Sequence, residues 1–348
     1  MLLGRVNRNI IANRIRAITP FKFLPTCQSR LSHTLPRRPY EIEIGVSFAG
    51  KRRRTPARKT IGFPSDHPIA QWRDKLLRWH TKELISSSAG EDFFYVTQSI
   101  HNSGFSLGIS DGIGGWSGDG VDPSLFSQGL MYFASQHAAT AWAGEADFDP
   151  IQETSALGKS DRTLSPVEIM SMSYQDVLNE PLIECGSSTA CIVNIDAQSG
   201  KLSAANLGDS SFSIIRSSSI LHEQGPQTHY FNCPRQLAKL LPKHQSHLQI
   251  TDGPEHADTF SAQLRHEDLV ILSTDGLGDN VHPAEVLTLA SLIRRRTADQ
   301  PGANFAQKLA DGLVEYAVAC MHSHDKSSPF EKAARGNGFE YTGGKIDE

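Results

Sequence analysis

The sequence lacks the features that mark several classes of protein. Its 348 residues include only five cysteines, none in a C-x-x-C pair, which excludes a disulfide-rich secreted scaffold. No apolar run approaches the roughly 20 residues that a membrane-spanning helix needs, so we expect no integral membrane segment. No repeat with a period of about 20–50 residues is visible. These absences leave a globular protein with free thiols, which is typical of a reducing compartment.

Acidic residues are absent from the first 40 positions. Eight of the 34 basic residues and none of the 38 acidic ones lie there, so this segment has a formal charge of +8 and the remainder −12. Its apolar residues, among them Leu3, Ile10 and Ile18, can share one helical face, which is typical of a mitochondrial transit peptide. The alternatives are a disordered tail and a nucleic-acid-binding arm, although the acidic remainder would repel nucleic acid. We predict a transit peptide over residues 1–40 with an undetermined cleavage site, a mitochondrial matrix location and no nucleic-acid partner.

The spacing of apolar and turn residues predicts strands in two sets, with helices between and after them. Strands are expected over residues 41–48, 92–96, 105–110, 189–195, 201–207, 211–215, 219–222 and 268–274. Helices are expected after Asp122-Pro123 and Ser165-Pro166, where the first residue can cap the helix, and over 283–296 and 303–322. The closely spaced strands between 189 and 222 predict an antiparallel meander. This order indicates an α+β fold in which two sheets pack together and are covered by helices.

Two of the predicted strands end in an Asp-Gly dipeptide. Asp111-Gly112 follows residues 105–110, and Asp275-Gly276 follows residues 268–274. Carboxylates at strand ends can face a shared cleft, and Glu91-Asp92 and Asp209 add acidic groups at a strand start and a turn. Several carboxylates brought together without a cation would repel one another and take up protons. Because no His or Cys has zinc-ligand spacing, the sequence favours Mg²⁺ or Mn²⁺.

Each motif alone also has a structural explanation. Asp-Gly is a common turn dipeptide. Gly114-Gly115 fits neither the dinucleotide-binding fingerprint nor a P-loop. Ser187-Ser188 lies in no G-x-S-x-G nucleophile elbow, so we expect it to form hydrogen bonds at the start of a strand. The functional interpretation therefore depends on the order and spacing of the motifs together.

Taken in order, these motifs resemble those of the PPM-type (type 2C) metal-dependent Ser/Thr protein phosphatases. The matching stretches are residues 91–92, 108–116, 120–124, 185–190, 205–210, 273–277 and 343–347. The stretches 120–124 and 337–345 resemble in particular the mitochondrial branch of that family. The resemblance covers roughly residues 41–348 and implies a phosphatase domain that follows the transit peptide.

The resemblance implies a central antiparallel β-sandwich flanked by helices on both sides, with two Mg²⁺ or Mn²⁺ ions at one end. Asp111 would bridge the two ions, and Asp111 and Asp275 would form the catalytic centre. The implied metal ligands are Glu91, Asp111, Gly112, Asp275 and Asp347, with Asp209 and Asp279 at the positions of a third, weaker ion.

The implied reaction is hydrolysis of phosphoserine and phosphothreonine in mitochondrial proteins, in which a metal-activated water attacks phosphorus in line. The alternative is a catalytically impaired phosphatase-like protein that binds phosphoproteins or another partner. A small-molecule substrate also stays open, because the motifs specify the phosphoryl chemistry and not the attached group. All five core metal positions are present, which favours the enzyme.

Three features depart from the family pattern. Ile113 stands where many relatives have a histidine that protonates the leaving group, so the proton must come from elsewhere. No phosphate-binding arginine can be assigned before the first acidic motif. The sequence also ends one residue after Asp347, where relatives continue into an apolar strand. We therefore expect a domain without its last strand, with an exposed sheet edge, a weakly held Asp347, weak metal affinity and low activity.

Overall fold

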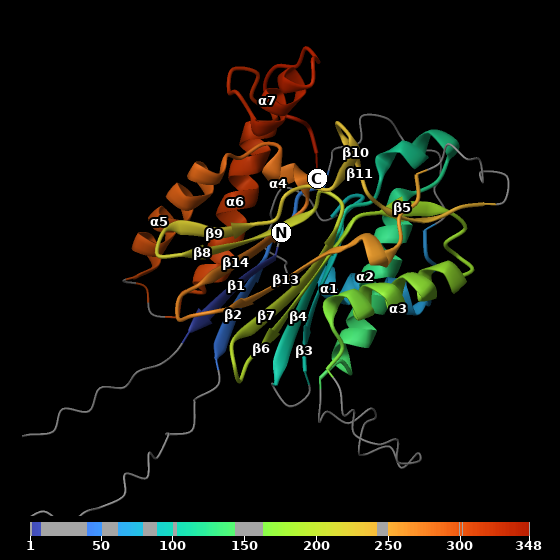
Figure 1. The fold of residues 1–348 in the computed structure, drawn as a ribbon, viewed down its shortest axis with the longest axis horizontal. Coiled ribbons are helices and arrows are strands. Elements are labelled where there is room, and N and C mark those ends of the chain that lie inside the picture. The colour runs from blue at the N-terminus through green and yellow to red at the C-terminus, as the bar shows by residue number, and fades with distance from the viewer. Residues whose placement is uncertain are drawn as a thin grey trace, which may run out of the picture.

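Two five-stranded antiparallel sheets form the centre of the molecule (Figure 1). The computed structural model describes residues 2–7, 40–50, 62–78, 89–99, 103–142, 163–241, 250–298, 300 and 302–347. The first sheet contains, in spatial order, β13 (Asp258–Gln263), β7 (Lys201–Leu207), β6 (Ala190–Asp196), β4 (Gly104–Ser110) and β3 (Phe93–Gln98). The second contains β2 (Glu41–Val46), β1 (Leu2–Asn7), β14 (Leu269–Ser273), β8 (Ser211–Arg216) and β9 (Ser219–Glu223).

The two sheets pack face to face over a shared apolar core. Leu107 and Ile109 of β4 point into it from the first sheet, as their alternation with serine and glycine predicts. Phe212, Val270 and Leu272 enter it from the second sheet. These side chains are almost fully buried, so the alternating strand pattern accounts for the sandwich.

Helices cover both outer faces, which confirms the predicted α+β architecture. On the first sheet lie α1 (Pro68–Arg78), α2 (Pro123–Ala139) and α3 (Pro166–Asn179), at the right in Figure 1. On the second lie α5 (Pro283–Ala298) and α6 (Phe305–Met321), with the short α4 (Asp275–Gly278) at its end. A further helix, α7 (Pro329–Gly336), stands above the sandwich near the C-terminus. No helix in the described ranges is both long and apolar enough to cross a membrane.

The predicted helix starts are confirmed by their caps. The Asp122 carboxylate accepts a hydrogen bond from the backbone N–H of Ser124, 3.1 Å away. Ser165 and Glu168 form a reciprocal capping box at the start of α3. Both helices have proline at their first position, where no backbone N–H is needed.

Helix α6 is joined to strand β2 at two neighbouring residues. A Cβ atom added to Gly45 would lie 2.3 Å from the backbone of Ala306, so only glycine permits this approach. The Gln307 side chain accepts a hydrogen bond from Val46 N (3.1 Å) and donates one to Val46 O (2.7 Å). The amide of Gln307 therefore satisfies the backbone of Val46 as a neighbouring strand would.

The predicted meander between residues 189 and 222 is wrong in one respect. Strands β6 and β7 pair with each other in the first sheet, whereas β8 and β9 belong to the second. The chain crosses from one sheet to the other at Gly208, Asp209 and Ser210. Gly208 has a φ of +104°, which a residue with a side chain rarely adopts. This crossing places Asp209 at the end of the sandwich.

The sequence analysis did not predict strand β1. It runs antiparallel between β2 and β14, with Leu2 opposite both Val46 and Leu272. Strand β14 is therefore paired on both sides, with β1 and with β8. The remainder of the predicted transit peptide, residues 8–39, lies outside the described ranges.

Several small elements were also not predicted. They are α1, α7, β13, the paired strands β12 (Leu237–Lys239) and β5 (Gly186–Ser188), the paired strands β10 (Thr228–Tyr230) and β11 (Cys233–Pro234), and the 3₁₀ turns at Gly114–Asp119 and Pro254–His256. Strands β10, β11 and β5 and helix α7 lie towards the end of the sandwich where β14 leads into α4 (Figure 1).

Candidate metal centre

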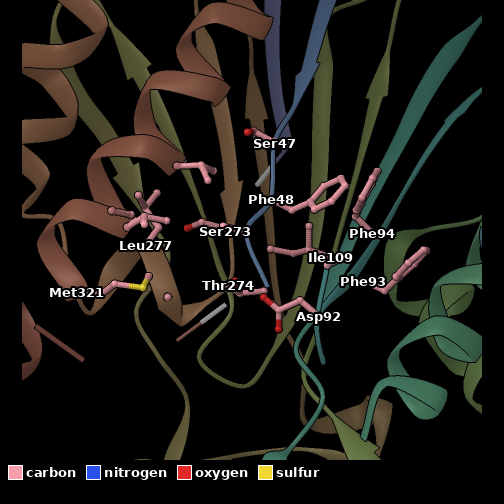
Figure 2. Close-up of a pocket in the computed structure, with 16 residues that line it drawn as sticks. Ser47, Phe48, Asp92, Phe93, Phe94, Ile109, Ser273, Thr274, Leu277 and Met321 are labelled. Atoms are coloured by element: carbon pink, nitrogen blue, oxygen red, sulfur yellow. The ribbon is translucent and has the colours of Figure 1, made fainter. Parts of the chain in front are cut away.

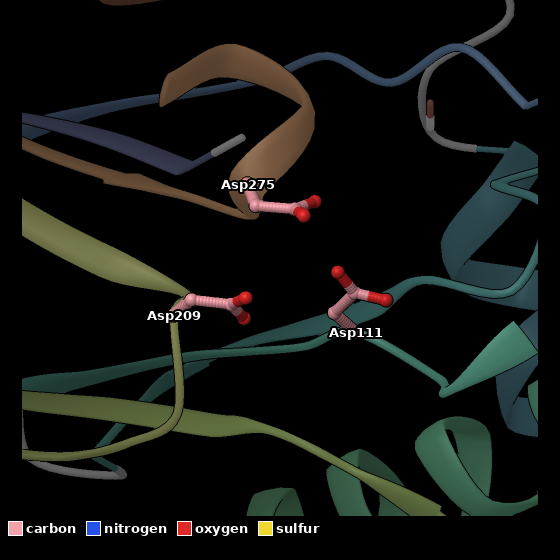
Figure 3. Close-up of side chains that lie close together, drawn as sticks. All are labelled: Asp111, Asp209 and Asp275. Atoms are coloured by element: carbon pink, nitrogen blue, oxygen red, sulfur yellow. The ribbon is translucent and has the colours of Figure 1, made fainter. Parts of the chain in front are cut away.

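Three aspartates from different parts of the sequence converge at this end of the sandwich (Figure 3). Asp111 follows β4, Asp209 lies at the crossing between β7 and β8, and Asp275 begins α4 after β14. Each offers a carboxylate oxygen within 4.8 Å of the other two. The predicted convergence of Asp111, Asp209 and Asp275 is therefore present, because the strands that carry them end at the same place.

A second acidic trio shares Asp275 with the first. Asp279, at the end of α4, and Asp347, near the C-terminus, each offer an oxygen within 4.8 Å of one on Asp275. Among the described residues the predicted acidic positions thus form two groups, joined at Asp275. The two groups together contain five carboxylates, which is a high density of negative charge.

Burial and mutual repulsion change the pKa values of these carboxyl groups. Burial raises the pKa of Asp111 well above its usual range, and Asp92 and Asp275 raise it further. Burial and the charge of Asp275 raise the pKa of Asp209 to about 7, although Lys345 opposes the rise. The Oδ1 atom of Asp209 is buried without a hydrogen-bond partner among the described residues. Without a cation, burial and mutual repulsion therefore favour the protonated forms of these two carboxyl groups.

Asp111 is held in place by hydroxyl groups at the start of β6. Its backbone N–H donates to Thr189 Oγ1 at 3.0 Å, and its carbonyl oxygen accepts from Thr189 N, also at 3.0 Å. Ser188 accepts a hydrogen bond from Ser110, and Thr189 is hydrogen-bonded to Ser210 beside Asp209. The serine and threonine run therefore braces the turns that carry the acids. The predicted structural role of Ser187-Ser188 is confirmed.

Gly112 lies where a larger residue would not fit. A Cβ atom there would be 2.6 Å from the carbonyl oxygen of Glu91 and 2.8 Å from that of Pro123. The Glu91 side chain lies against Gly114, so that a Cβ on Gly114 would be 2.9 Å from Glu91 Oε2. Neither acidic trio of the described residues includes Glu91. Its neighbour Asp92 has the strongest charge interaction with Asp111, and the sequence analysis did not assign Asp92 a ligand role.

An apolar cavity lies behind the acidic cluster, between β14, β4 and α6 (Figure 2). Phe48, Ile109 and Met321 line it, and Asp92 and Thr274 lie together at one end. These apolar walls keep water from one side of the carboxylates.

The C-terminal segment is held more firmly than the sequence suggested. Asn280, which is fully buried, donates to the carbonyl oxygen of Lys345 at 2.8 Å and accepts from its N–H at 2.9 Å. The N–H of Gly344 donates to Ser323 O, and that of Gly343 donates to Glu331 Oε2. The expectation of a weakly held Asp347 is therefore wrong for this segment.

Lys345 is the charged neighbour of the second trio that the sequence analysis did not identify. Its Nζ atom lies 2.5 Å from Asp275 Oδ2, 2.6 Å from Asp279 Oδ2 and 2.9 Å from Asp347 Oδ2. Burial alone would lower the pKa of Lys345, but the three carboxylates raise it above the usual range. Burial raises the pKa of Asp279, and the ammonium group opposes that rise. A single lysine in the sequence gave no sign of this contact, because it forms only in the folded chain.

Relatives of known class share most of the length of this chain. It is 33% identical over 269 residues to the human protein phosphatase PTC7 homolog, covering 77% of this chain and 80% of the relative. It is also 33% identical over 259 residues to the Danio rerio protein phosphatase PTC7 homolog, covering 74% and 78% respectively. The 5-azacytidine resistance protein azr1 of Schizosaccharomyces pombe is 33% identical over 314 residues, covering 89% and 88%.

A solved structure has the same fold. The X-ray structure of the photosystem II phosphatase PBCP matches with a TM-score of 0.55 and 23% identity, covering 74% of this chain and 88% of that one. No protein-family model matches the chain. The identity to the PTC7 homologs, spread over three quarters of the sequence, shows that the chain belongs to the PPM (type 2C) family of protein phosphatases.

Proposed function

We propose that the acidic centre binds two Mg²⁺ or Mn²⁺ ions and hydrolyses phosphoserine and phosphothreonine in mitochondrial proteins. The observation that carries this proposal is the convergence of Asp111, Asp209 and Asp275 from three separate elements. Family membership supplies the reaction class, and the arrangement of this chain's own carboxylates supports the two-ion centre.

The residues present fit hard divalent cations. The donors are carboxylate oxygens, with the backbone of Gly112 close by, and Mg²⁺ and Mn²⁺ prefer such oxygen ligands. The buried Asp209 Oδ1 has no hydrogen-bond partner among the described residues, and cations held by the neighbouring carboxylates would offset its negative charge. The raised pKa values of Asp111 and Asp209 also indicate carboxylates that lack sufficient positive charge nearby.

In this proposal Asp111, Asp275, Asp347, Glu91 and the carbonyl oxygen of Gly112 are the residues that would hold the two ions. The ions would lower the pKa of an attacking water and neutralise charge that develops on the phosphoryl oxygens. Thr189 and Asn280 keep the carboxylates in position, since they hold the backbones of the segments that carry them.

The test is hydrolysis of a phosphothreonine peptide by the full chain, with Mn²⁺ or Mg²⁺ and with a chelator. We expect turnover only with metal. Asp111→Asn should reduce turnover by at least about 100-fold, which corresponds to about 3 kcal/mol of transition-state stabilisation. The matched control is Asp176→Asn, because Asp176 of α3 pairs with His137 of α2, outside both acidic trios. Turnover in chelator, or full activity of Asp111→Asn, would contradict the proposal.

If the folded protein binds phosphopeptide and metal but never turns over, the substrate-binding alternative replaces catalysis. Equal turnover of a phosphopeptide and small phosphate esters under matched conditions would instead remove the protein-substrate part of the proposal.

The mitochondrial matrix location is supported by the basic, acid-free composition of residues 1–40. A fluorescent protein carrying this segment should enter mitochondria, and one carrying a version with its arginines changed to glutamine should not. Uptake of neither fusion would contradict the proposed location without affecting the proposed reaction.

A further inference from the structure

The cation nearest to the second acidic trio belongs to the protein itself. Lys345 contacts all three carboxylates, and its Nζ lies between 2.5 and 2.9 Å from an oxygen of each. An ammonium group has three N–H donors and no acceptor, so three carboxylates use its full hydrogen-bonding capacity. The side chains are mostly withdrawn from water, with 17% exposure for Lys345 and 12% for Asp347.

The position of Lys345 is fixed by its backbone. Asn280 holds both its N–H and its carbonyl oxygen, and the Asn280 side chain also donates to Gly276 O at 3.0 Å in α4. Asn280 therefore joins Lys345 to the same helix that carries Asp275 and Asp279. The Nζ atom also lies 5.0 Å from the centre of the Phe330 ring, which limits its space on that side.

The two trios differ in their ion pairs with basic side chains. No lysine or arginine ion pair is recorded for Asp111 or Asp209 in the described part of the chain, whereas Asp279 and Asp347 both pair with Lys345. Lys345 therefore supplies positive charge by direct contact at the Asp279 end of the cluster, whereas it acts on Asp209 only from a distance.

We propose that the Lys345 ammonium group takes the place of a third metal ion beside Asp279, so that this chain binds two divalent ions. The inference builds on the two-ion centre proposed above. Asp279 then serves as the partner of an internal cation, while Asp275 and Asp347 pair with this ammonium group and also serve as ligands of a divalent ion.

The test is the number of Mn²⁺ ions bound per chain, measured by equilibrium dialysis and by calorimetric titration. The wild-type chain should bind two ions. Lys345→Met keeps the length of the side chain but removes its charge, and it should bind a third, weaker ion. The double variant Lys345→Met/Asp279→Asn should return to two. Lys239→Met is the matched control, because Lys239 donates only to backbone carbonyls at the end of α3 in the recorded contacts.

A second variant keeps the inference testable if Lys345→Met does not fold. Asp279→Asn alone should leave the number of bound ions unchanged, because its carboxylate serves Lys345. A loss of one ion in Asp279→Asn, or three ions bound to the wild type, would overturn the role of Lys345 and leave the two-ion centre standing. No Mn²⁺ binding by the folded wild type would overturn both proposals. A folded Lys345→Met that still binds two ions would overturn the lysine inference alone.

Discussion

Asn280 connects two segments of the metal centre that are far apart in the sequence. It follows the acids of α4 directly, and its side chain holds the backbone of Lys345 two residues before Asp347. The neighbouring Asp-Gly motif was recognised in the sequence, but asparagine is common in turns, so Asn280 gave no sign of this role. Its function becomes visible only when the C-terminal segment is in place.

Replacing Asn280 should loosen the segment that carries Asp347. We expect Asn280→Ala to weaken Mn²⁺ binding by about 10- to 100-fold, the usual effect of losing a group that orients a metal ligand. Calorimetric titration of both proteins measures this. Asn304→Ala is the control, because it removes the N-cap of α6 at a cost of about 1 kcal/mol and lies outside the acidic cluster. Equal weakening in both variants would show that general destabilisation is the cause.

Ile113 has no group that can donate a proton to the leaving alkoxide. A histidine at this position has an ordinary pKa near neutrality and can act as a general acid. We expect Ile113→His to increase turnover of a phosphothreonine peptide about 100-fold, at the low end of the usual range for general acid catalysis. An aryl phosphate, whose leaving group needs no proton, should gain little. The ratio of the two rates is the measurement, and equal gains would contradict the stated reason.

At the scale of elements, apolar periodicity predicted the long strands and helices well. Strand β4 was expected over 105–110 and spans Gly104–Ser110, because its apolar side chains alternate strictly. Helix α3 begins where its Ser-Pro start signal predicted. Periodicity does not specify which sheet a strand joins, and so the crossing at Gly208 was missed. Strand β13 was missed because its side chains are mostly exposed and polar.

Residues 2–7 can be interpreted as a structural strand or as part of a targeting segment, and a deletion separates the two. As an inner strand, it pairs with both β2 and β14. Deleting residues 2–7 should therefore lower the melting temperature of the protein by several degrees, since two strands lose backbone partners. Deleting residues 10–35, outside the described ranges, is the control and should have little effect. An unchanged melting temperature after the first deletion would favour a purely targeting role for the segment.

For the whole molecule, the acidic centre couples metal binding to stability. The pKa of Asp209 is raised from 3.8 to about 7, and that of Asp111 is also raised. Between about pH 4 and pH 7 the metal-free folded chain therefore binds more protons than the unfolded chain. Its free energy of unfolding falls as the pH rises through this range. The melting temperature in chelator should drop between about pH 4 and pH 7.

Saturating Mn²⁺ should make this pH dependence much weaker, because the bound ions keep the carboxylates ionised. Scanning calorimetry at several pH values, with metal and with chelator, measures the difference. Asp209→Asn is the matched variant and should reduce the slope in chelator. A melting temperature in chelator that rises with pH over this range would contradict the assignment of the raised pKa values.

The sequence predicted that acids at strand ends would gather, and three of them do. It did not predict how they group, because Asp275 proves to be shared between two trios and Lys345 contacts one of them. Such groupings depend on where α4 and the C-terminal segment lie in space. No local pattern of residues specifies how close these two segments lie to each other.

The contact between Val46 and Gln307 also affects how the protein is made. These residues are 261 positions apart, and the side chain of Gln307 bonds to both backbone groups of Val46 at the end of β2. At about 5–20 residues per second, the ribosome needs on the order of tens of seconds to synthesise the intervening chain. During that time β2 lacks α6, the helix that packs against it in the folded protein. The newly made N-terminal half is therefore a natural client for chaperones, and the molecule should close only after release of nearly its whole length.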